Sequence, residues 1–313
     1  MKAAAIHNRL MIFLLAALAI TCVISPWMSL GADWFASQWP QLLTERVPFE
    51  KIFNRGFMIA AMILFIVYRR ILIPAELKRL LAPGLRIAHR DLLAGCGLAL
   101  ISMVLLVTVM TVAGVFTPYF RVSLTTGLSR FASSLSAGIF AGFLEEVFFR
   151  GILFAGLRKH GGPLRAYVLA NLFYSVIHFV KPGDEYFIDQ LDLLAGFRHL
   201  GTTFEPFLDP LSLVPGIIGL FLLGAVMSYA LARTGNLYLS IGLHAGWIFS
   251  LKMVRVFGNF TRQDLGWMFG STDPKIVSGV ATWVGILLVG LAVSRLTRRD
   301  ARLSSDRPPA TTA

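Results

Sequence analysis

The sequence predicts an all-α protein: a polytopic membrane bundle of about eight transmembrane helices with a polar cavity inside the membrane. Its 313 residues are 56% hydrophobic and only 15% charged, whereas a soluble domain is nearer half apolar and a quarter charged. The apolar residues also come in runs of about 20, the length that crosses a hydrocarbon core of ~30 Å. A few carboxylate, guanidinium and imidazole side chains lie inside those runs, where polar groups are costly without partners.

Eight apolar segments are candidate spans: 10–30, 52–74, 92–116, 132–157, 164–181, 212–233, 237–254 and 278–296. The first follows Lys2 and Arg9, as the apolar part of a signal peptide does. Its apolar run continues to about Leu30, past the usual length of such a part, and this favours a retained anchor. The second is the weakest, because Arg55 interrupts its start.

The basic residues predict the orientation. The formal charge is +12, but Lys and Arg lie in short stretches between apolar runs, so no continuous basic face for nucleic acid is expected. They gather before the first segment and after the second, fourth and eighth, on one side of an eight-span bundle. The excess of positive charge on that side predicts that both termini are cytoplasmic. Short loops in an all-helical chain suit a bacterial inner membrane.

We expect a single helix-bundle domain over 1–299, with a motif-bearing core at about 130–252 and a disordered cytoplasmic tail over 300–313. The longest loop, 182–211, mixes apolar and acidic residues. A helix lying on the membrane surface and a solvated connector are both consistent with it. Cys22 and Cys96 lie in apolar runs without a CxxC pair, so neither a disulfide framework nor a cysteine metal site is supported.

The fourth segment carries Glu145, Glu146 and Arg150 near its middle. At 100° per residue, Glu146 and Arg150 are about 40° apart on a helix and one turn from each other, so they can pair. Glu145 points about 140° from Arg150. Arg150 would neutralise and orient Glu146, leaving Glu145 to act as a base or ligand. A purely structural ion pair is the alternative, but it leaves the second carboxyl buried without that partner.

Of the six histidines, only His178 and His244 lie within predicted segments, the fifth and the seventh. With Glu145 they form a set that could bind and deprotonate a water. They would also make a zinc site with one open position. The residues alone leave both chemistries open. Asn171 and Tyr174 share the helix face of His178 and are expected to line the same cavity.

These residues resemble the motifs of the CPBP family of intramembrane proteases, which includes the type II CAAX prenyl endopeptidases and the Abi-type bacterial proteins. Glu145 to Arg150 matches the family's EExxxR motif, and Tyr174 to His178 resembles FxxxH with Tyr in place of Phe. The stretch ending at His244 resembles the approach to the third motif, HxxxN. The resemblance covers roughly residues 130–252.

The resemblance implies an eight-helix fold and peptide hydrolysis by an activated water. It assigns water activation to Glu145 and His178, support to Glu146 and Arg150, and oxyanion binding to His244. Family members have been described both as metalloproteases and as glutamate-based enzymes, and the second description favours no metal. The implied substrate is a membrane-tethered protein or peptide.

One position departs from the family's pattern. The third motif ends in Asn or another polar residue four positions after its His, where this chain has Ile248. A missing oxyanion donor can lower the rate by 10²–10³.

Two further classes of function remain open from the sequence. The carboxylates and histidines could form the relay of a proton-coupled transporter, although no repeated halves or paired broken helices are present. A non-catalytic membrane scaffold of the same fold is the other class, and Ile248 is consistent with it.

Overall fold

The computed structural model describes residues 2–39, 46–72, 75–180, 186–262, 264–270 and 276–305. The chain folds into two compact units. Unit 1 comprises Met1–Pro74 and Ile177–Leu213, and unit 2 comprises Ala75–Val176 and Val214–Ala313.

Unit 1 is built on a pair of long helices, α1 (Lys2–Gln38) and α2 (Phe49–Leu72), with α8 (Ala195–Thr202) against α1 and a 3₁₀ turn, η2 (Glu205–Leu208), after it. Helix α8 lies close to α1 because Gly196 has no side chain: a Cβ there would lie 2.1 Å from the carbonyl oxygen of Cys22. Outside the helices, Arg46 bonds both Asp33 and Asp189 and so ties the chain segments together.

Unit 2 holds most of the helices. In chain order they are α3 (Ala75–Leu81), α4 (Leu85–Val112), α5 (Leu124–Glu146), the π-helix η1 (Val147–Phe154), α6 (Ala155–Gly161), α7 (Pro163–Ile177), α9 (Pro210–Thr234), α10 (Tyr238–Val254), α11 (Gly266–Phe269), the 3₁₀ turn η3 (Ile276–Ser278) and α12 (Val280–Ser305). The last residue of α7 and the first turn of α9 belong to unit 1.

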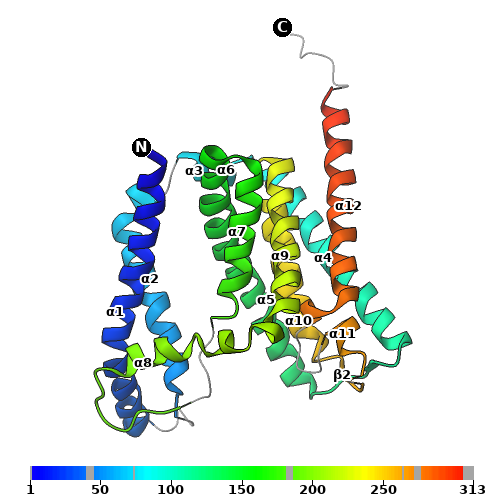
Figure 1. Ribbon diagram of the computed structural model, residues 1–313. Coiled ribbons are helices and arrows are strands. Elements are labelled where there is room, and N and C mark those ends of the chain that lie inside the picture. The colour runs from blue at the N-terminus through cyan, green and yellow to red at the C-terminus, as the bar shows by residue number, and fades with distance from the viewer. Residues whose placement is uncertain are drawn as a thin grey trace. The chain divides into compact units, whose positions relative to one another are not determined.

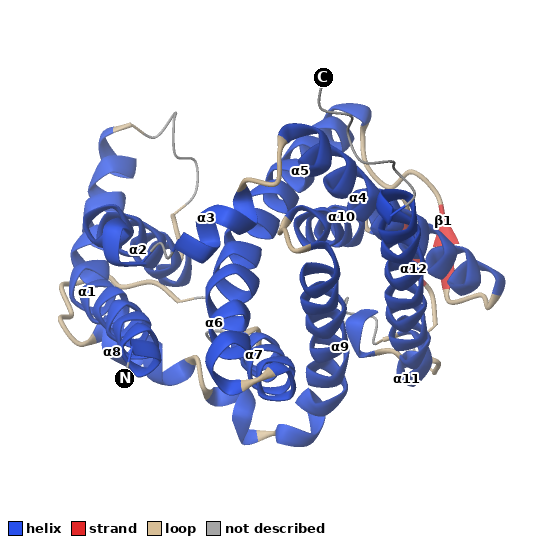
Figure 2. Cartoon of the chain, turned by 90° about the horizontal axis from the view of Figure 1, so that it is seen from above, coloured by secondary structure: helices blue, strands red, loops and turns tan. Residues whose placement is uncertain are grey.

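Helix α10 is the central element of unit 2, packed between α4 and α5 (Figures 1 and 2). Glycines allow both approaches. A Cβ at Gly242 would lie 2.2 Å from Leu92 O on α4, and a Cβ at Gly138 would lie 2.7 Å from Ala245 O. Close helix packing at small residues is what a membrane bundle uses in place of the hydrophobic effect.

A short sheet closes one end of this unit. Strand β1 (Phe116–Pro118) follows α4 and pairs antiparallel with β2 (Gly258–Phe260), which follows α10, with Phe116 opposite Phe260. Phe116 packs with Met110, Val115, Val254 and Phe269 in a small apolar cluster. The sheet therefore joins the ends of the two helices that pack most closely.

The helical class expected from the sequence is confirmed, and each of the eight predicted segments is mostly helical over its described residues. Among the described residues, four helical stretches are long and apolar enough to cross a membrane: Ile12–Gln38, Leu85–Val112, Pro210–Thr234 and Val280–Arg298. Helices α7 and α10, with 15 and 17 residues, are shorter than the ~20 residues of a standard span. The expected count of about eight spans is therefore not confirmed.

Two other expectations concern the longest loop and the C-terminal tail. The loop 182–211 contains the helix α8, as one of its two interpretations required. Asp184 and Glu185 of that loop lie outside the described residues, as does 306–313 of the expected tail. Helix α12 continues through the first part of that tail, to Ser305.

Candidate active site

Glu146 and Arg150 form the ion pair that their spacing predicts. Arg150 Nη1 donates to Glu146 Oε1 over 2.8 Å, and the two side chains are 1% and 0% exposed. The contact is local to one helix, since side chains four residues apart lie on the same face. A second Arg150 nitrogen, Nη2, donates to the carbonyl oxygen of Gly224 on α9 over 3.3 Å. The guanidinium thus links two helices while it neutralises Glu146.

The helix changes type at this pair. Helix α5 ends at Glu146, and the π-helix η1 runs from Val147 to Phe154, with Arg150 in its middle. Sequence reasoning assumed a regular α-helix here. A π-helix is rare and often marks a functional site. Its wider turn changes the direction of the side chains and the pattern of backbone hydrogen bonds.

His244 joins the pair from α10. Its Nδ1 lies 2.8 Å from Glu146 Oε1, and the ring is 7% exposed. The approach depends on Gly142 of α5, where a Cβ would lie 3.0 Å from the backbone nitrogen of Ala245, next to His244. The Nδ1 edge of the ring therefore faces the carboxylate that Arg150 also contacts.

Glu145 lies on the other side of the same imidazole. Its Oε2 is 3.7 Å from His244 Nε2, beyond hydrogen-bond length, and its side chain is 32% exposed. The ring of His244 is therefore placed between two carboxylates of different character. Glu146 is buried and ion-paired, whereas Glu145 is the more accessible of the two.

Sequence reasoning missed the surroundings of Arg150. The guanidinium carbon lies 4.3 Å from the ring centre of Tyr174, a cation–π contact, and Tyr174 also meets the ring of His244 edge-on at 6.1 Å. Gly224 leaves room for this: a Cβ there would lie 2.8 Å from Asn171 Oδ1 and 3.2 Å from Arg150 Nη2. These neighbours of Gly224 come from other helices, so its spacing in the sequence does not reveal them.

Asn171 has a defined role in packing. Its Nδ2 donates to Tyr167 O over 2.8 Å, and its Oδ1 accepts from Ser228 Oγ of α9 over 3.0 Å. The side chain is thus held between α7 and α9. Asn171 and Tyr174 were both expected to line the cavity. Of the two, Tyr174 is in cation–π contact with Arg150.

The structure brings together Glu145, Glu146, Arg150 and His244. His178 follows the last residue of α7, is half-buried, and belongs to unit 1. Ile248 is half-buried one turn after His244 on α10. Its side chain supplies no hydrogen-bond donor.

Glu146 and Arg150 each have a buried polar atom that makes no hydrogen bond to the described residues. Within the described part of the chain, Glu146 Oε2 and Arg150 Nε have no hydrogen-bond partner. Unsatisfied buried polar atoms are few in folded proteins and need a reason such as catalysis or a bound water.

The zinc alternative needs three converging ligands. Among the residues that the structure describes, no three His, Cys, Asp or Glu side chains are grouped so as to hold a metal ion. Glu145 and His244 are the two members of the expected zinc triad that lie together in unit 2.

Comparison with protein families gives one match. Residues 127–250 match the family described as type II CAAX prenyl endopeptidase Rce1-like. The comparisons with curated proteins and with solved structures found no match. The matched residues begin in α5 and end in α10 and include the whole cluster, together with His178 and Ile248. This match supports the assignment of residues 127–250 to the CPBP family of intramembrane proteases.

Proposed function

We propose that this protein is an intramembrane endopeptidase that hydrolyses a peptide bond of a membrane-tethered protein or peptide with a water activated by Glu145. The observation that carries the proposal is the position of His244. One ring nitrogen is 2.8 Å from the buried, ion-paired Glu146, and the other is 3.7 Å from the more exposed Glu145. Two carboxylates in such different surroundings are suited to different tasks.

Glu145 takes the proton of the attacking water while the water oxygen bonds to the scissile carbonyl carbon. The carbonyl oxygen becomes an oxyanion, and His244, protonated on Nε2, donates to it. Glu146 supports that imidazolium through Nδ1, as the carboxylate of a Ser-His-Asp triad does. When the C–N bond breaks, the proton on Glu145 passes to the leaving nitrogen. The water thus ends as OH on the acyl carbon and H on the amine.

His178 acts with Glu145 on the water in this proposal, by its match to the second family motif. The role requires His178 to reach the cluster in unit 2. A carboxylate base alone typically contributes 10²–10⁴ in rate, so loss of either water activator should nearly abolish cleavage.

The test uses the full chain in liposomes with a panel of membrane-tethered peptides, including a prenylated CAAX peptide, and cleavage is followed by mass spectrometry. We expect Glu145→Gln and His178→Ala to lower cleavage at least about 100-fold. Glu76→Gln is the matched control, because Glu76 is a carboxylate of the same unit that pairs with Arg79 and Lys159 away from the cluster. Full activity of both site variants on a confirmed substrate would falsify the proposal.

The same preparation decides the metal question. Metal content and the effect of a chelator are measured on the active protein. Glutamate-based hydrolysis predicts full activity after chelation and no bound metal in proportion to the protein. Loss of cleavage on chelation that zinc restores would instead assign Glu145 and His244 as metal ligands.

A further inference from the structure

Outside the matched residues, α4 and α12 lie side by side (Figure 1), and a groove runs between them. It consists of two adjoining hollows of about 730 and 530 Å³ that share Leu98, Ile101 and Ala292. Neither helix lies within the matched residues 127–250. The groove is hollow because glycines face it: a Cβ at Gly97 or at Gly285 would meet no atom within 4 Å.

The two ends of the groove differ in chemistry. From Leu98 to Val280 the lining is almost wholly aliphatic, and Leu105 and Leu288 are 61% and 58% exposed. The other end is lined by Arg295 and Arg298 near the end of α12. The lining thus has one cationic end and one long apolar end.

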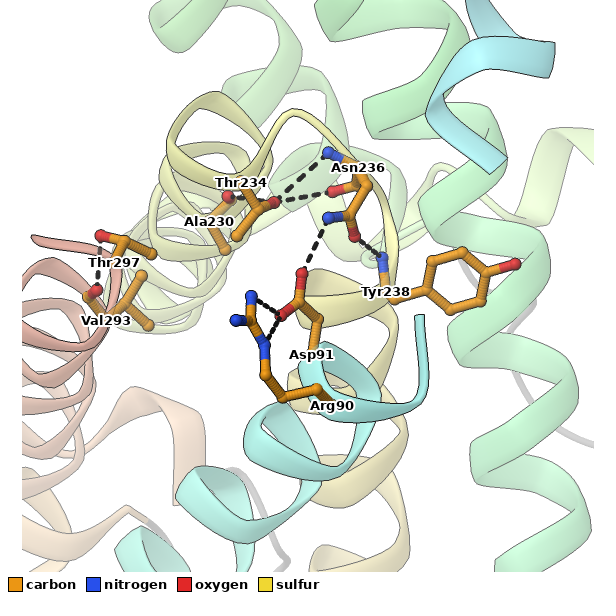
Figure 3. Close-up of polar contacts among 8 residues, drawn as sticks. All are labelled: Arg90, Asp91, Ala230, Thr234, Asn236, Tyr238, Val293 and Thr297. Atoms are coloured by element: carbon orange, nitrogen blue, oxygen red, sulfur yellow. Dashed lines mark hydrogen bonds and ion pairs between the residues drawn. The ribbon is translucent and has the colours of Figure 1, made fainter. Parts of the chain in front are cut away.

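Among the described side chains, neither arginine has a carboxylate partner within ion-pair distance. Asp91, a carboxylate on α4 near this end, is already engaged, since its Oδ1 accepts from Arg90 and its Oδ2 accepts from Asn236 over 2.8 Å. Figure 3 shows the Asp91 carboxylate turned toward those two side chains. Among the side chains that the structure describes, no ion pair of Arg295 or Arg298 occurs.

Thr297, between the two arginines, is turned inward instead. Its hydroxyl donates to Val293 O over 2.9 Å (Figure 3). It also accepts from Arg233 Nε over 3.1 Å. Residue 297 is 8% exposed, whereas Arg295 and Arg298 are exposed. The packing of α12 against α9 therefore leaves the two guanidinium groups outside and available.

The dimensions fit a membrane lipid. From Val280 to Arg298, α12 rises roughly 27 Å at 1.5 Å per residue. One leaflet contributes about half of the ~30 Å hydrocarbon core, so an acyl chain fits within the apolar part while its phosphate reaches the arginines. Guanidinium groups bind phosphate with paired, charge-assisted hydrogen bonds. A free phosphate would use only the cationic end and leave the apolar hollow without an occupant.

We propose that the α4–α12 groove binds one anionic glycerophospholipid, with its phosphate between Arg295 and Arg298 and one acyl chain along Leu98, Leu105 and Leu288. The site is independent of the proposed hydrolysis, since Glu145, Glu146, Arg150 and His244 lie on α5, η1 and α10.

Native mass spectrometry of the detergent-purified full chain tests this with phosphatidylglycerol and phosphatidylcholine of the same acyl chains. We expect phosphatidylglycerol to be retained about tenfold more tightly, and the double variant Arg295→Gln/Arg298→Gln to lose that preference. The matched control is Arg158→Gln/Arg165→Gln, which removes the same charge from α6 and the first turn of α7. This variant should keep the preference for phosphatidylglycerol.

A second variant tests whether an acyl chain occupies the groove. Gly97→Leu should fill the hollow without a clash and weaken phosphatidylglycerol binding about tenfold. Gly156→Leu, at another helical glycine with no atom within 4 Å of its Cβ, should leave binding unchanged. Equal binding of the two lipids would overturn the proposal. So would displacement of the lipid by millimolar inorganic phosphate together with unchanged binding to Gly97→Leu, which would indicate a simple phosphate site.

Discussion

His244 in unit 2 and His199 in unit 1 are both buried, at 5% and 1% exposed, but their surroundings differ in kind. The His244 ring lies between the carboxylates of Glu146 and Glu145. The His199 ring is surrounded by Phe49, Phe53 and Tyr186, with ring centres 4.7 to 5.7 Å away. Within the described residues, neither nitrogen of His199 has a hydrogen-bond partner.

The comparison shows that burial has different consequences for a histidine with a carboxylate partner and for one without. Burial lowers the pKa of His199, because the aromatic rings offer the imidazolium no anionic partner. His199 is thus held neutral as a packing residue of unit 1. At His244 a buried carboxylate is ready to support a positive ring, which is what proton transfer requires. The carboxylate partner, and not burial itself, makes a histidine a catalytic candidate.

The largest expected effect on stability comes from replacing Glu146, whose carboxylate contacts both His244 and Arg150. Glu146→Gln leaves Arg150 buried without its counter-ion, and we expect the free energy of unfolding to fall by about 3 kcal/mol or more. The measurement is denaturant unfolding in detergent. Glu76→Gln, which breaks only exposed ion pairs, should cost about 0–1 kcal/mol. Equal losses in the two variants would show that the buried pair does not stabilise the bundle.

The second prediction concerns the missing donor beside His244. Ile248→Asn places an amide one helical turn after His244, where the family motif has its polar residue. We expect cleavage to rise by up to about 100-fold if an oxyanion donor is limiting. Initial rates on a confirmed substrate measure this, with Ile248→Leu as the apolar control. A rate unchanged from that of the control would mean that another group already binds the oxyanion.

The third prediction tests the packing that holds Arg150. Gly224→Ala puts a methyl group 2.8 Å from Asn171 Oδ1 and 3.2 Å from Tyr174 Cδ1, and overpacking of this kind costs about 1–3 kcal/mol. Gly156→Ala, where no atom lies within 4 Å, should be neutral or slightly stabilising. Thermal unfolding of both variants gives the comparison, and a neutral Gly224→Ala would contradict the close contact.

The smallest effect is expected at His199. Because its pKa is lowered in the folded state, the unfolded state binds the extra proton, so stability is complete above the ordinary pKa of about 6.5 and falls as pH drops below it. His199→Phe should therefore reduce the loss of stability between pH 7.5 and pH 5. Thermal unfolding at the two pH values measures it.

His89→Phe, at an exposed histidine, is the control and should leave the pH dependence as it is. A wild-type stability that does not change between the two pH values would contradict a neutral, buried His199.

The helical segments were predictable because apolar runs and helical spacing are local properties. Each predicted segment is mostly helical over its described residues, and the pair of Glu146 with Arg150 follows from a separation of four residues. The sequence could not reveal that His199, expected in a loop, is buried on α8, since its aromatic neighbours come from other parts of the chain. The change from α-helix to π-helix at Val147 also has no local signal that we could identify.

By itself, then, the sequence determined the helical class, the membrane character and the residues that carry the charge. Only the tertiary structure decided which of them meet. Glu146 and His244 are 98 residues apart, and they touch because Gly138 and Gly142 of α5 let the backbone of Ala245 approach. Such a contact depends on the shapes of two helices together. The placement of Tyr174 over Arg150 and the groove between α4 and α12 both follow from packing of that kind.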